Sequence, residues 1–363
     1  MRLRLPLAAA VLVAVTLAPI GFASPPAGAE AAGLEGIPRF SHIVVLTEEN
    51  ENESSTFAST SPATFLNSQV ANGVFLPNYY GTGHVSLDNY LAMVSGQPGN
   101  GLSNTDCLTV SLWTCAQAAS AFNSGINLGD QLETAGLSWR SYMDGTPTAC
   151  FHAPYIVGDP TPDPYQGNST QPPAYNYADR HNPFIYFTDF IGNQARCEAH
   201  QRPYSELSAA LTDDSTWTDT TLPAFSFITP DTCHDGHDSP CAGQTIGGLS
   251  AMDAWLQTEL PPLLHYLESH NGLLVINFDE GNPGSPEPNL CSTCASGGAG
   301  GRTGALLLGA HLRIGTTVDA GYDHYSLLRT IEDSFSIADH LGLAGQSESM
   351  TPAFKTARSR PSS

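Results

Sequence analysis

Two kinds of apolar segment alternate along this chain and predict a domain of mixed α and β structure. Short, nearly continuous apolar runs typical of buried strands lie at 42–47, 73–75, 137–142, 225–228, 273–278 and 305–308. Apolar residues at helical spacing lie at 64–71, 86–95, 128–135, 247–260 and 326–335. We expect Gly96 and Gly136 to end two of these helices, and Pro261-Pro262 to end the helix that starts at 247. The alternation favours an α/β fold with a mostly parallel sheet flanked by helices on both faces.

One long stretch, 144–185, breaks this pattern. It is rich in Pro, Gly, Asn and Tyr and shows neither the strand period nor the helix period. We therefore expect a long irregular insertion at the surface, such as a lid or a substrate rim. The chain has no internal repeat, so we place one folded domain at 41–345, with a linker at 30–40 and a disordered tail at 346–363.

The N-terminus has the pattern of a secretory signal peptide. Arg2 and Arg4 precede an apolar run at 5–22, and the small residues Ala27-Gly28-Ala29 follow it. An uncleaved membrane anchor is the alternative, but the run is short and contains two prolines. We expect residues 1–29 to be removed and the protein to be secreted, with no stable membrane anchor.

Cysteine usage agrees with an exported protein. The chain has eight cysteines, at 107, 115, 150, 197, 233, 241, 291 and 294. An even number in an exported chain favours disulfides. Short separations favour the bridges Cys107–Cys115, Cys233–Cys241 and Cys291–Cys294, which leaves Cys150–Cys197 as the fourth. The alternative for Cys291 and Cys294 is half of a zinc site or a redox motif, although no second pair with metal spacing accompanies them.

Composition narrows the choice of partners. There are 13 Lys and Arg residues against 35 Asp and Glu, which gives a formal net charge of −22. Such a surface repels nucleic acid and anionic membranes, so we expect no nucleic-acid partner. A hydrophobic content of 41% is enough to fill a large core despite the many glycines and prolines. Composition leaves the oligomeric state open.

Two distant segments carry the candidate chemistry. Ser86 stands at the start of an apolar helical pattern, where free N–H groups and the helix dipole suit an attacking oxygen and a phosphate. Serine is also a preferred helix cap, which is the structural alternative. Asp279 and Glu280 end a fully apolar strand, a position where open α/β sheets build ligand sites. Together these segments suggest a metal-assisted phosphoester hydrolase.

Five sequence blocks in order resemble the phosphoesterase family. They are His42 to Asn50, Gly83 to Gly96, Phe227 to Asp238, Asp279-Glu280, and Asp323 to Asp333. That family includes exported bacterial acid phosphatases and phosphatidylcholine-type phospholipases C, and is related in fold to alkaline phosphatases. The resemblance covers nearly all of 42–335 and implies an alkaline-phosphatase-like fold. Val85 and Asp88 stand where the short acid phosphatases usually carry proline, so we expect the loop around Ser86 to differ in shape.

These blocks, read as chemistry, suggest a metal site. Glu49, Asn50 and Asp279 are the expected ligands of one divalent cation, with Glu280 as a further candidate and Ser86 Oγ touching the ion. Oxygen ligands of this kind suit Ca²⁺, Mg²⁺ and Mn²⁺ alike. The alternative is that these polar groups are solvated or form turns.

A catalytic set follows from the same blocks. We expect Ser86 to attack phosphorus and form a phosphoserine intermediate, with Asn89 holding the phosphate oxygens. His237 is expected to protonate the leaving group, with His84 or His324 assisting.

The sequence therefore predicts a secreted, metal-assisted phosphoric monoester hydrolase, similar to an acid phosphatase and acting on small phosphomonoesters. A phospholipase C or another phosphodiesterase using the same site is the first alternative. A non-catalytic exported binding protein on the same fold is the second.

Overall fold

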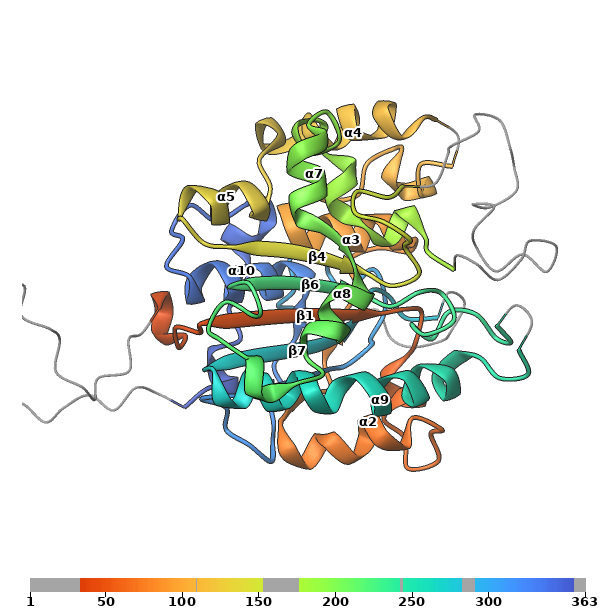
Figure 1. Cartoon of the computed structure of the whole chain (residues 1–363), viewed down its shortest axis with the longest axis vertical. Coiled ribbons are helices and arrows are strands. Elements are labelled where there is room, and N and C mark those ends of the chain that lie inside the picture. Colours follow the sequence, from red (N-terminus) through yellow and green to blue (C-terminus); the bar gives the residue numbers. More distant parts are fainter. Residues whose placement is uncertain (1–32, 109, 153–175, 242–243, 283–290, 356–363) are drawn as a thin grey trace, which may run out of the picture.

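An eight-stranded sheet forms the centre of the molecule (Figure 1). The computed structural model describes residues 33–108, 110–152, 176–241, 244–282 and 291–355. The strand order is β5-β4-β6-β1-β7-β8-β2-β9, and β8 alone runs antiparallel to its two neighbours. The strands are β1 His42–Glu48, β2 Val74–Leu76, β3 Tyr79–Tyr80, β4 Trp139–Met143, β5 Gln201–Pro203, β6 Phe225–Thr229, β7 Gly272–Phe278, β8 Ala305–Gly309, β9 Thr316–Thr317 and β10 Tyr322–Asp323. β3 and β10 pair separately as a small parallel sheet.

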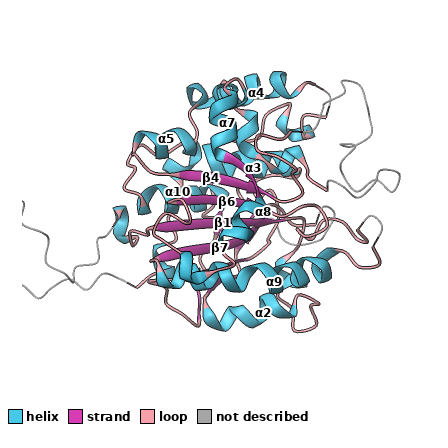
Figure 2. Ribbon diagram, in the orientation of Figure 1, coloured by secondary structure: helices cyan, strands magenta, loops and turns pink. Residues whose placement is uncertain are grey.

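Helices cover both faces of this sheet, as predicted (Figure 2). They are α1 Glu53–Thr56, α2 Thr64–Gln69, α3 Ser86–Ser95, α4 Leu112–Ser120, α5 Leu128–Thr134, α6 Thr188–Ile191, α7 Gln194–His200, α8 Tyr204–Ala210, α9 Gly248–Ser269 and α10 His324–Ser334. The helices α2, α8 and α9 share one apolar cluster, whereas α3 to α7 and α10 pack on the opposite face.

The central strand β1 shows why the sheet is buried on both faces. All seven of its residues are buried. Because side chains alternate along a strand, Ile43 and Val45 enter the cluster around α3 and α10, while Val44 and Leu46 enter the cluster around α9. A strand buried on both sides needs a continuous apolar run, which is the signal in the sequence.

Helix α9 corrects one prediction. It does not end at Pro261 but continues to Ser269 with both prolines inside it. Pro261 is exposed, while Leu260 and Leu263 are buried and the apolar stripe continues beyond them. The carbonyl groups that the prolines leave without an N–H partner can therefore be hydrated.

The eight cysteines pair as predicted. The structure contains the bridges Cys107–Cys115, Cys150–Cys197, Cys233–Cys241 and Cys291–Cys294, with no free thiol among the cysteines, all of which are described. The zinc or redox alternative for Cys291 and Cys294 is therefore not needed.

Both ends of the domain extend further than predicted. Ile37 and Phe40 of the expected linker are buried in the core. The prediction of a disordered tail from 346 is wrong for residues 346–355, because Met350 and Phe354 are buried and Phe354 bridges to Leu312. Residues 1–32 and 356–363, including the predicted signal peptide, lie outside the described residues. No described helix is long and apolar enough to cross a bilayer.

The stretch 144–185 is only partly at the surface. Residues 153–175 lie outside the described part, but residues 177–187 are almost entirely buried. Asn182 donates to the Tyr177 hydroxyl at 2.9 Å, and Phe184 packs against Trp139. The end of this segment is thus core, and the prediction of a wholly external insertion is wrong there.

Close backbone contacts between glycines join the segments after β3 and β7. Gly300 N–H donates to the Gly81 carbonyl at 3.1 Å, and the Gly300 carbonyl accepts from Gly281 at 2.8 Å. A Cβ at Gly300 would lie 2.5 Å from the Gly81 carbonyl carbon and from the Gly83 carbonyl oxygen. No side chain at Gly300 fits between these two backbone segments, so their packing requires glycine at this position.

We predict that Gly300→Ala lowers the free energy of unfolding by about 1–3 kcal/mol or more, because the new methyl group overlaps fixed backbone atoms. Urea denaturation measures this. Gly101→Ala is the matched control, since a Cβ there meets nothing within 4 Å. Equal stability of the two variants would show that the contact is looser than described.

Glu332 in α10 is a buried carboxyl group away from the sheet edge. Its side chain is fully buried, and Oε1 accepts from Leu341 N at 2.8 Å. Burial raises the pKa of Glu332 to about 8, only partly opposed by the Leu341 hydrogen bond. The folded protein therefore holds a proton there that the unfolded chain has already lost above its ordinary pKa near 4.5.

The stability that depends on this proton is complete below about pH 4.5 and is lost as pH rises through about 8. Because glutamine does not titrate, Glu332→Gln should gain stability relative to wild type, on the order of 2–4 kcal/mol, between pH 5 and pH 9. Urea unfolding at both pH values checks this, with exposed Glu348→Gln as control. A constant difference between wild type and Glu332→Gln would contradict it.

Candidate active site

The carboxyl ends of β1 and β7 bring four predicted site residues to one edge of the sheet. Glu49 and Asn50 follow β1, Asp279 and Glu280 follow β7, and the two parallel strands end in register. Asp279 Oδ1 accepts from the backbone N–H of Asn50 at 3.0 Å and from that of Glu280 at 2.6 Å. One carboxylate oxygen therefore joins the two strand ends.

Ser86 meets these strand ends from the first turn of α3. Its hydroxyl donates to Glu49 Oε2 at 3.1 Å, and Asn50 Nδ2 donates to the same oxygen at 3.2 Å. Ser86 is buried, and its hydroxyl bonds Glu49 in place of an N–H group of its own helix. The preceding Val85 has φ 157° and ψ 148°, a strained conformation that proline cannot adopt. The loop therefore differs from one with proline at this position, as the sequence suggested.

His84 pairs with Glu280. His84 Nδ1 lies 2.6 Å from Glu280 Oε2, and the imidazole remains 39% exposed. Burial, with Asp106 and Asp88 nearby, raises the pKa of Glu280 to about 8. The Glu280 carboxylate thus orients His84 with part of its ring open to solvent.

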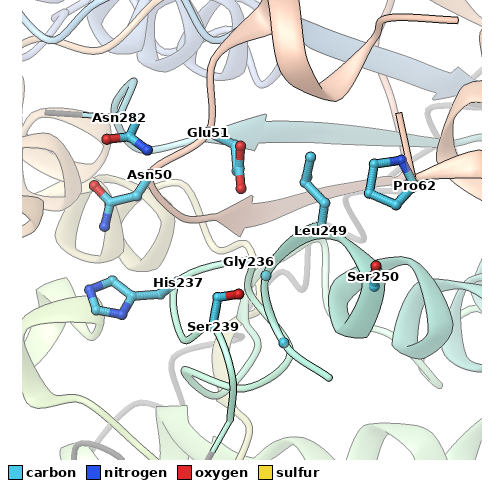
Figure 3. A pocket seen from close by; sticks show the side chains of 11 residues that line it. Asn50, Glu51, Pro62, Gly236, His237, Ser239, Leu249, Ser250 and Asn282 are labelled. Carbon is cyan, nitrogen blue, oxygen red and sulfur yellow. The ribbon is translucent and has the colours of Figure 1, made fainter. Parts of the chain in front are cut away.

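His237 is oriented in a similar way. Its Nδ1 lies 2.8 Å from Asp238 Oδ1, and its backbone N–H donates to Asp235 Oδ1 at 2.8 Å. Together with Asn50, His237 lines a pocket of about 470 Å³. Figure 3 shows both side chains on the same side of this pocket. His84 and His237 are therefore both histidines held by a carboxylate with an open ring face, as proton transfer requires.

His181 is a residue of this site that the sequence analysis missed. It is buried, with Nε2 at 3.3 Å from Glu49 Oε1 and Nδ1 at 3.5 Å from Asp235 Oδ2. Its ring stacks on Tyr90 of α3 at 5.2 Å. The sequence feature that could have revealed it is the apolar run just after it, from Pro183 to Phe187, because such a run indicates a buried segment and not a surface loop.

The sequence analysis also missed Arg180, because it lies in the stretch 144–185 that was expected at the surface. It is buried, and its Nε lies 3.9 Å from Asp106 Oδ2. The other oxygen of Asp106 accepts from Leu87 N at 2.9 Å, so Asp106 connects Arg180 to the start of α3. A buried guanidinium therefore lies near the Ser86 end of the helix.

Asn89 does not have the predicted role. Its Oδ1 accepts from Thr82 N at 2.7 Å and from Gly83 N at 3.1 Å, and its Nδ2 donates to Gly83 O and Val85 O. Both ends of the amide are used by the loop before Ser86. Asn89 shapes that loop and is not free to hold phosphate oxygens, so we correct the prediction.

His324 also differs from its prediction. It is fully buried, with Nε2 at 2.6 Å from the Asp279 backbone carbonyl and Nδ1 at 2.8 Å from the Tyr79 hydroxyl. Because a carbonyl only accepts, Nε2 carries the proton and Nδ1 accepts from Tyr79. Burial lowers the pKa of His324 to about 4. His324 thus uses both ring nitrogens within the protein and supports the backbone at Asp279.

The carboxylates of this edge are unusually concentrated. Glu48, Glu49, Asp235 and Asp279 are each fully buried. Burial raises the pKa of Asp279 to about 8, with the neighbouring Glu280 adding to the rise. Burial also raises the pKa of Glu49, reinforced by Asp279 and Asp235. Such a set favours binding of positive charge.

The oxygens available to a cation fit part of the predicted ligand set. Asn50 Oδ1, Asp279 Oδ2 and Glu49 Oε1 are buried and have no hydrogen-bond partner among the described residues. Glu49 Oε1 lies 3.3 Å from His181 Nε2. Oxygen atoms from a carboxylate and an amide suit a hard divalent cation. Glu280 fits less well, because its carboxylate pairs with His84.

A second group could also hold a metal ion. Asp144, Asp231 and His234 bring ligand atoms within 4.8 Å of one another. His234 Nδ1 lies 2.8 Å from Asp144 Oδ2, and Asp231 Oδ1 accepts from the backbone N–H of Cys233. These groups already satisfy one another, whereas oxygens at the Glu49 edge remain without partners.

Asp88 does not point into the pocket. It is buried, and its Oδ2 would lie 2.4 Å from a Cβ at Gly99 and 3.1 Å from one at Gly83. Burial raises its pKa to about 6. The carboxyl group is thus enclosed between two loops and is not among the residues that line the pocket.

Comparison with known proteins agrees with this geometry. Residues 50–338 match the model of the phosphoesterase family. A phosphatidylinositol-3-phosphatase of Mycobacterium tuberculosis is 28% identical over 90% of this chain and 86% of its own length. A phosphate-repressible acid phosphatase of Penicillium chrysogenum is 26% identical over 73% of this chain, which spans only about half (52%) of that relative.

Among solved structures, a protein of the alkaline phosphatase superfamily from Vibrio parahaemolyticus has a TM-score of 0.51, with 13% identity over 85% of this chain and 68% of its own. This likeness shows the fold, as the sequence predicted. Because the family model covers most of the chain, and its relatives are named as phosphatases, this protein belongs to the phosphoesterase family and is a phosphoric ester hydrolase.

Proposed function

We propose that the protein is a metal-assisted phosphomonoesterase, similar to the acid phosphatases, that acts through a phosphoserine at Ser86. The observation that carries this proposal is the Ser86 hydroxyl at 3.1 Å from Glu49 Oε2, at the end of β1 and beside Asp279. A hydroxyl at a helix start beside buried carboxylates is the arrangement needed for a nucleophile activated by a cation.

Glu49, Asn50 and Asp279 would hold one divalent cation, with Ser86 Oγ beside it. When bound, such an ion lowers the pKa of the hydroxyl and offsets negative charge in the transition state. The unpartnered oxygens of Asn50 and Asp279 support this ligand set. Ca²⁺, Mg²⁺ and Mn²⁺ all fit oxygen ligands, so the choice among them stays open.

The protein groups then divide the remaining work. Ser86 Oγ gives its proton to Glu49, to which it donates, and attacks phosphorus. The bond from phosphorus to the leaving oxygen breaks, and His237 gives that oxygen a proton. In the second half, His84, oriented by Glu280, takes a proton from a water that attacks phosphoserine, and Glu49 returns the proton to Ser86 as phosphate leaves. Proton exchange with solvent restores His237 and His84. Arg180 stabilises charge on the non-bridging oxygens, the role first assigned to Asn89.

The phosphomonoester is favoured over a diester for two reasons. The relatives compared above are named as phosphatases. The pocket beside His237 is lined mainly by polar groups and glycines, which does not suit two acyl chains. The contacts among Ser86, Glu49 and Asn50 favour an enzyme over a binding protein on the same fold.

We further propose that the protein is exported. The pattern of residues 1–29 supports this, and four disulfides belong in an oxidising compartment. Small soluble phosphomonoesters outside the cell would then be its substrates.

Ser86→Ala should reduce kcat for p-nitrophenyl phosphate at least about a thousandfold while the protein remains folded, because no attacking oxygen remains. Ser95→Ala, at the other end of α3, is the matched control and should keep most activity. Mass spectrometry of rapidly quenched wild-type protein should locate phosphate on Ser86. Near-normal turnover by folded Ser86→Ala would rule out this nucleophile.

Removal of divalent ions should reduce activity to below about one tenth, since the buried carboxylates would lose the charge that balances them. Dialysis against EDTA followed by titration with Ca²⁺, Mg²⁺ or Mn²⁺ measures the loss and its recovery. Asp279→Asn should need more metal for half recovery than wild type, whereas exposed Asp319→Asn should not. Full activity of metal-free protein would contradict the proposed ligand role.

A further inference from the structure

The pocket beside the proposed catalytic centre has a wall that the mechanism does not use. Asn50 and His237 form one side, and the other side consists of Glu51, Ser239 and the first turn of α9. Figure 3 shows the Glu51 carboxyl group between Asn50 and Leu249, with Gly236 and Ser239 below it. Among the described residues that line this pocket, Glu51 is the one carboxylate.

Glu51 is held so that part of it remains available. Its Oε2 accepts from Ser55 Oγ at 3.1 Å, and among the described residues Oε1 has no hydrogen bond. Gly236 lies beside it, where a Cβ would come 3.6 Å from Glu51 Cγ and 3.2 Å from the Glu49 carbonyl oxygen. Because Gly236 has no side chain, the space beside the Glu51 carboxyl group stays open.

The other lining groups mix donors and acceptors. Ser239 and Ser250 offer hydroxyls, and Asn50 and Asn282 offer amides. Helix α9 starts at Gly248 without a side-chain cap, so its first turn adds backbone N–H groups. Pro62 and Leu249 are the apolar members of the lining. A ligand with several hydroxyls can donate to Glu51 and accept from the amides and N–H groups.

We propose that this pocket is the leaving-group subsite and that Glu51 selects phosphomonoesters of polyhydroxylated alcohols, such as glycerol and sugar phosphates. The assignment rests on the proposed function, because His237, the group that protonates the leaving oxygen, lines the same pocket. A volume of about 470 Å³ accommodates a leaving group the size of a monosaccharide.

The same wall disfavours other leaving groups. A second phosphate in the pocket would be repelled by Glu51. An acyl chain would cover the carboxylate without hydrogen-bonding to it, which costs free energy. An aromatic leaving group such as phenol fits the space but leaves most polar groups of the pocket without a hydrogen bond. It therefore gains less binding free energy from this side of the pocket.

The test compares glucose 6-phosphate, phosphoethanolamine and phenyl phosphate as substrates of the metal-loaded full-length protein. In Glu51→Ala, the ratio of kcat/KM for glucose 6-phosphate to that for phenyl phosphate should fall at least about tenfold, mostly through a higher KM. Glu268→Ala is the matched control, since this glutamate is exposed in the last turn of α9 and should leave the ratio unchanged.

Three results would overturn the assignment. An unchanged ratio in Glu51→Ala would remove Glu51 from specificity. A selective loss of phosphoethanolamine turnover would show that the carboxylate selects a cationic leaving group instead. A wild-type preference for phenyl phosphate over glucose 6-phosphate would show that the pocket does not recognise hydroxyls. If wild type hydrolyses none of the three esters, the proposed function fails and not only the subsite.

Discussion

Concentrated buried negative charge is the constraint on which the rest of this structure depends. Five carboxyl groups lie at or after the ends of the neighbouring parallel strands β6, β1 and β7, and none is more than 3% exposed. They belong to Glu48, Glu49, Asp235, Asp279 and Glu280. These carboxyl groups must either hold protons or lie beside a cation, because removing several ionised carboxylates from water costs a large free energy. Under the proposed function, a divalent ion would supply the positive charge that this arrangement favours.

The surrounding backbone is organised to hold these groups in place. His324 donates to the backbone carbonyl of Asp279, and the Asp279 carboxylate accepts from the backbone N–H groups of Asn50 and Glu280. The glycine contacts around Gly300 connect the segment after β7 to the loop that carries Ser86. The position of Ser86 relative to the carboxylates therefore depends on backbone packing as much as on the site residues themselves.

Much of this arrangement could be predicted from the sequence. Apolar runs that end in paired polar residues located β1 and β7, and parallel pairing brings their ends together. Short cysteine spacing predicted three of the bridges, and the fourth, Cys150–Cys197, followed as the remaining pair. The sequence could not show how side chains share hydrogen bonds. Asn89 and His324 therefore received catalytic roles, although the amide of Asn89 bonds the loop before Ser86 and the ring of His324 contacts the Asp279 carbonyl and the Tyr79 hydroxyl.

The missed residues have a different cause. His181 lies in a segment whose many prolines and glycines suggested a surface loop, yet burial of that segment is decided by tertiary contacts with β6 and α3. Helix α9 continued through two prolines for a related reason: its buried stripe outweighed the local preference. Local propensity failed at these points because packing against distant elements determined the conformation.

The most direct test of the account is the number of divalent ions bound per chain at equilibrium. Metal-free protein should be titrated with Mn²⁺ and the free ion followed by electron paramagnetic resonance, for wild type and for the double variant Glu49→Gln, Asp279→Asn. The account predicts one tight site in wild type that is lost in the double variant while the fold is kept. Equal tight binding by both proteins, or none by wild type, would contradict the claim that these carboxylates hold the catalytic cation.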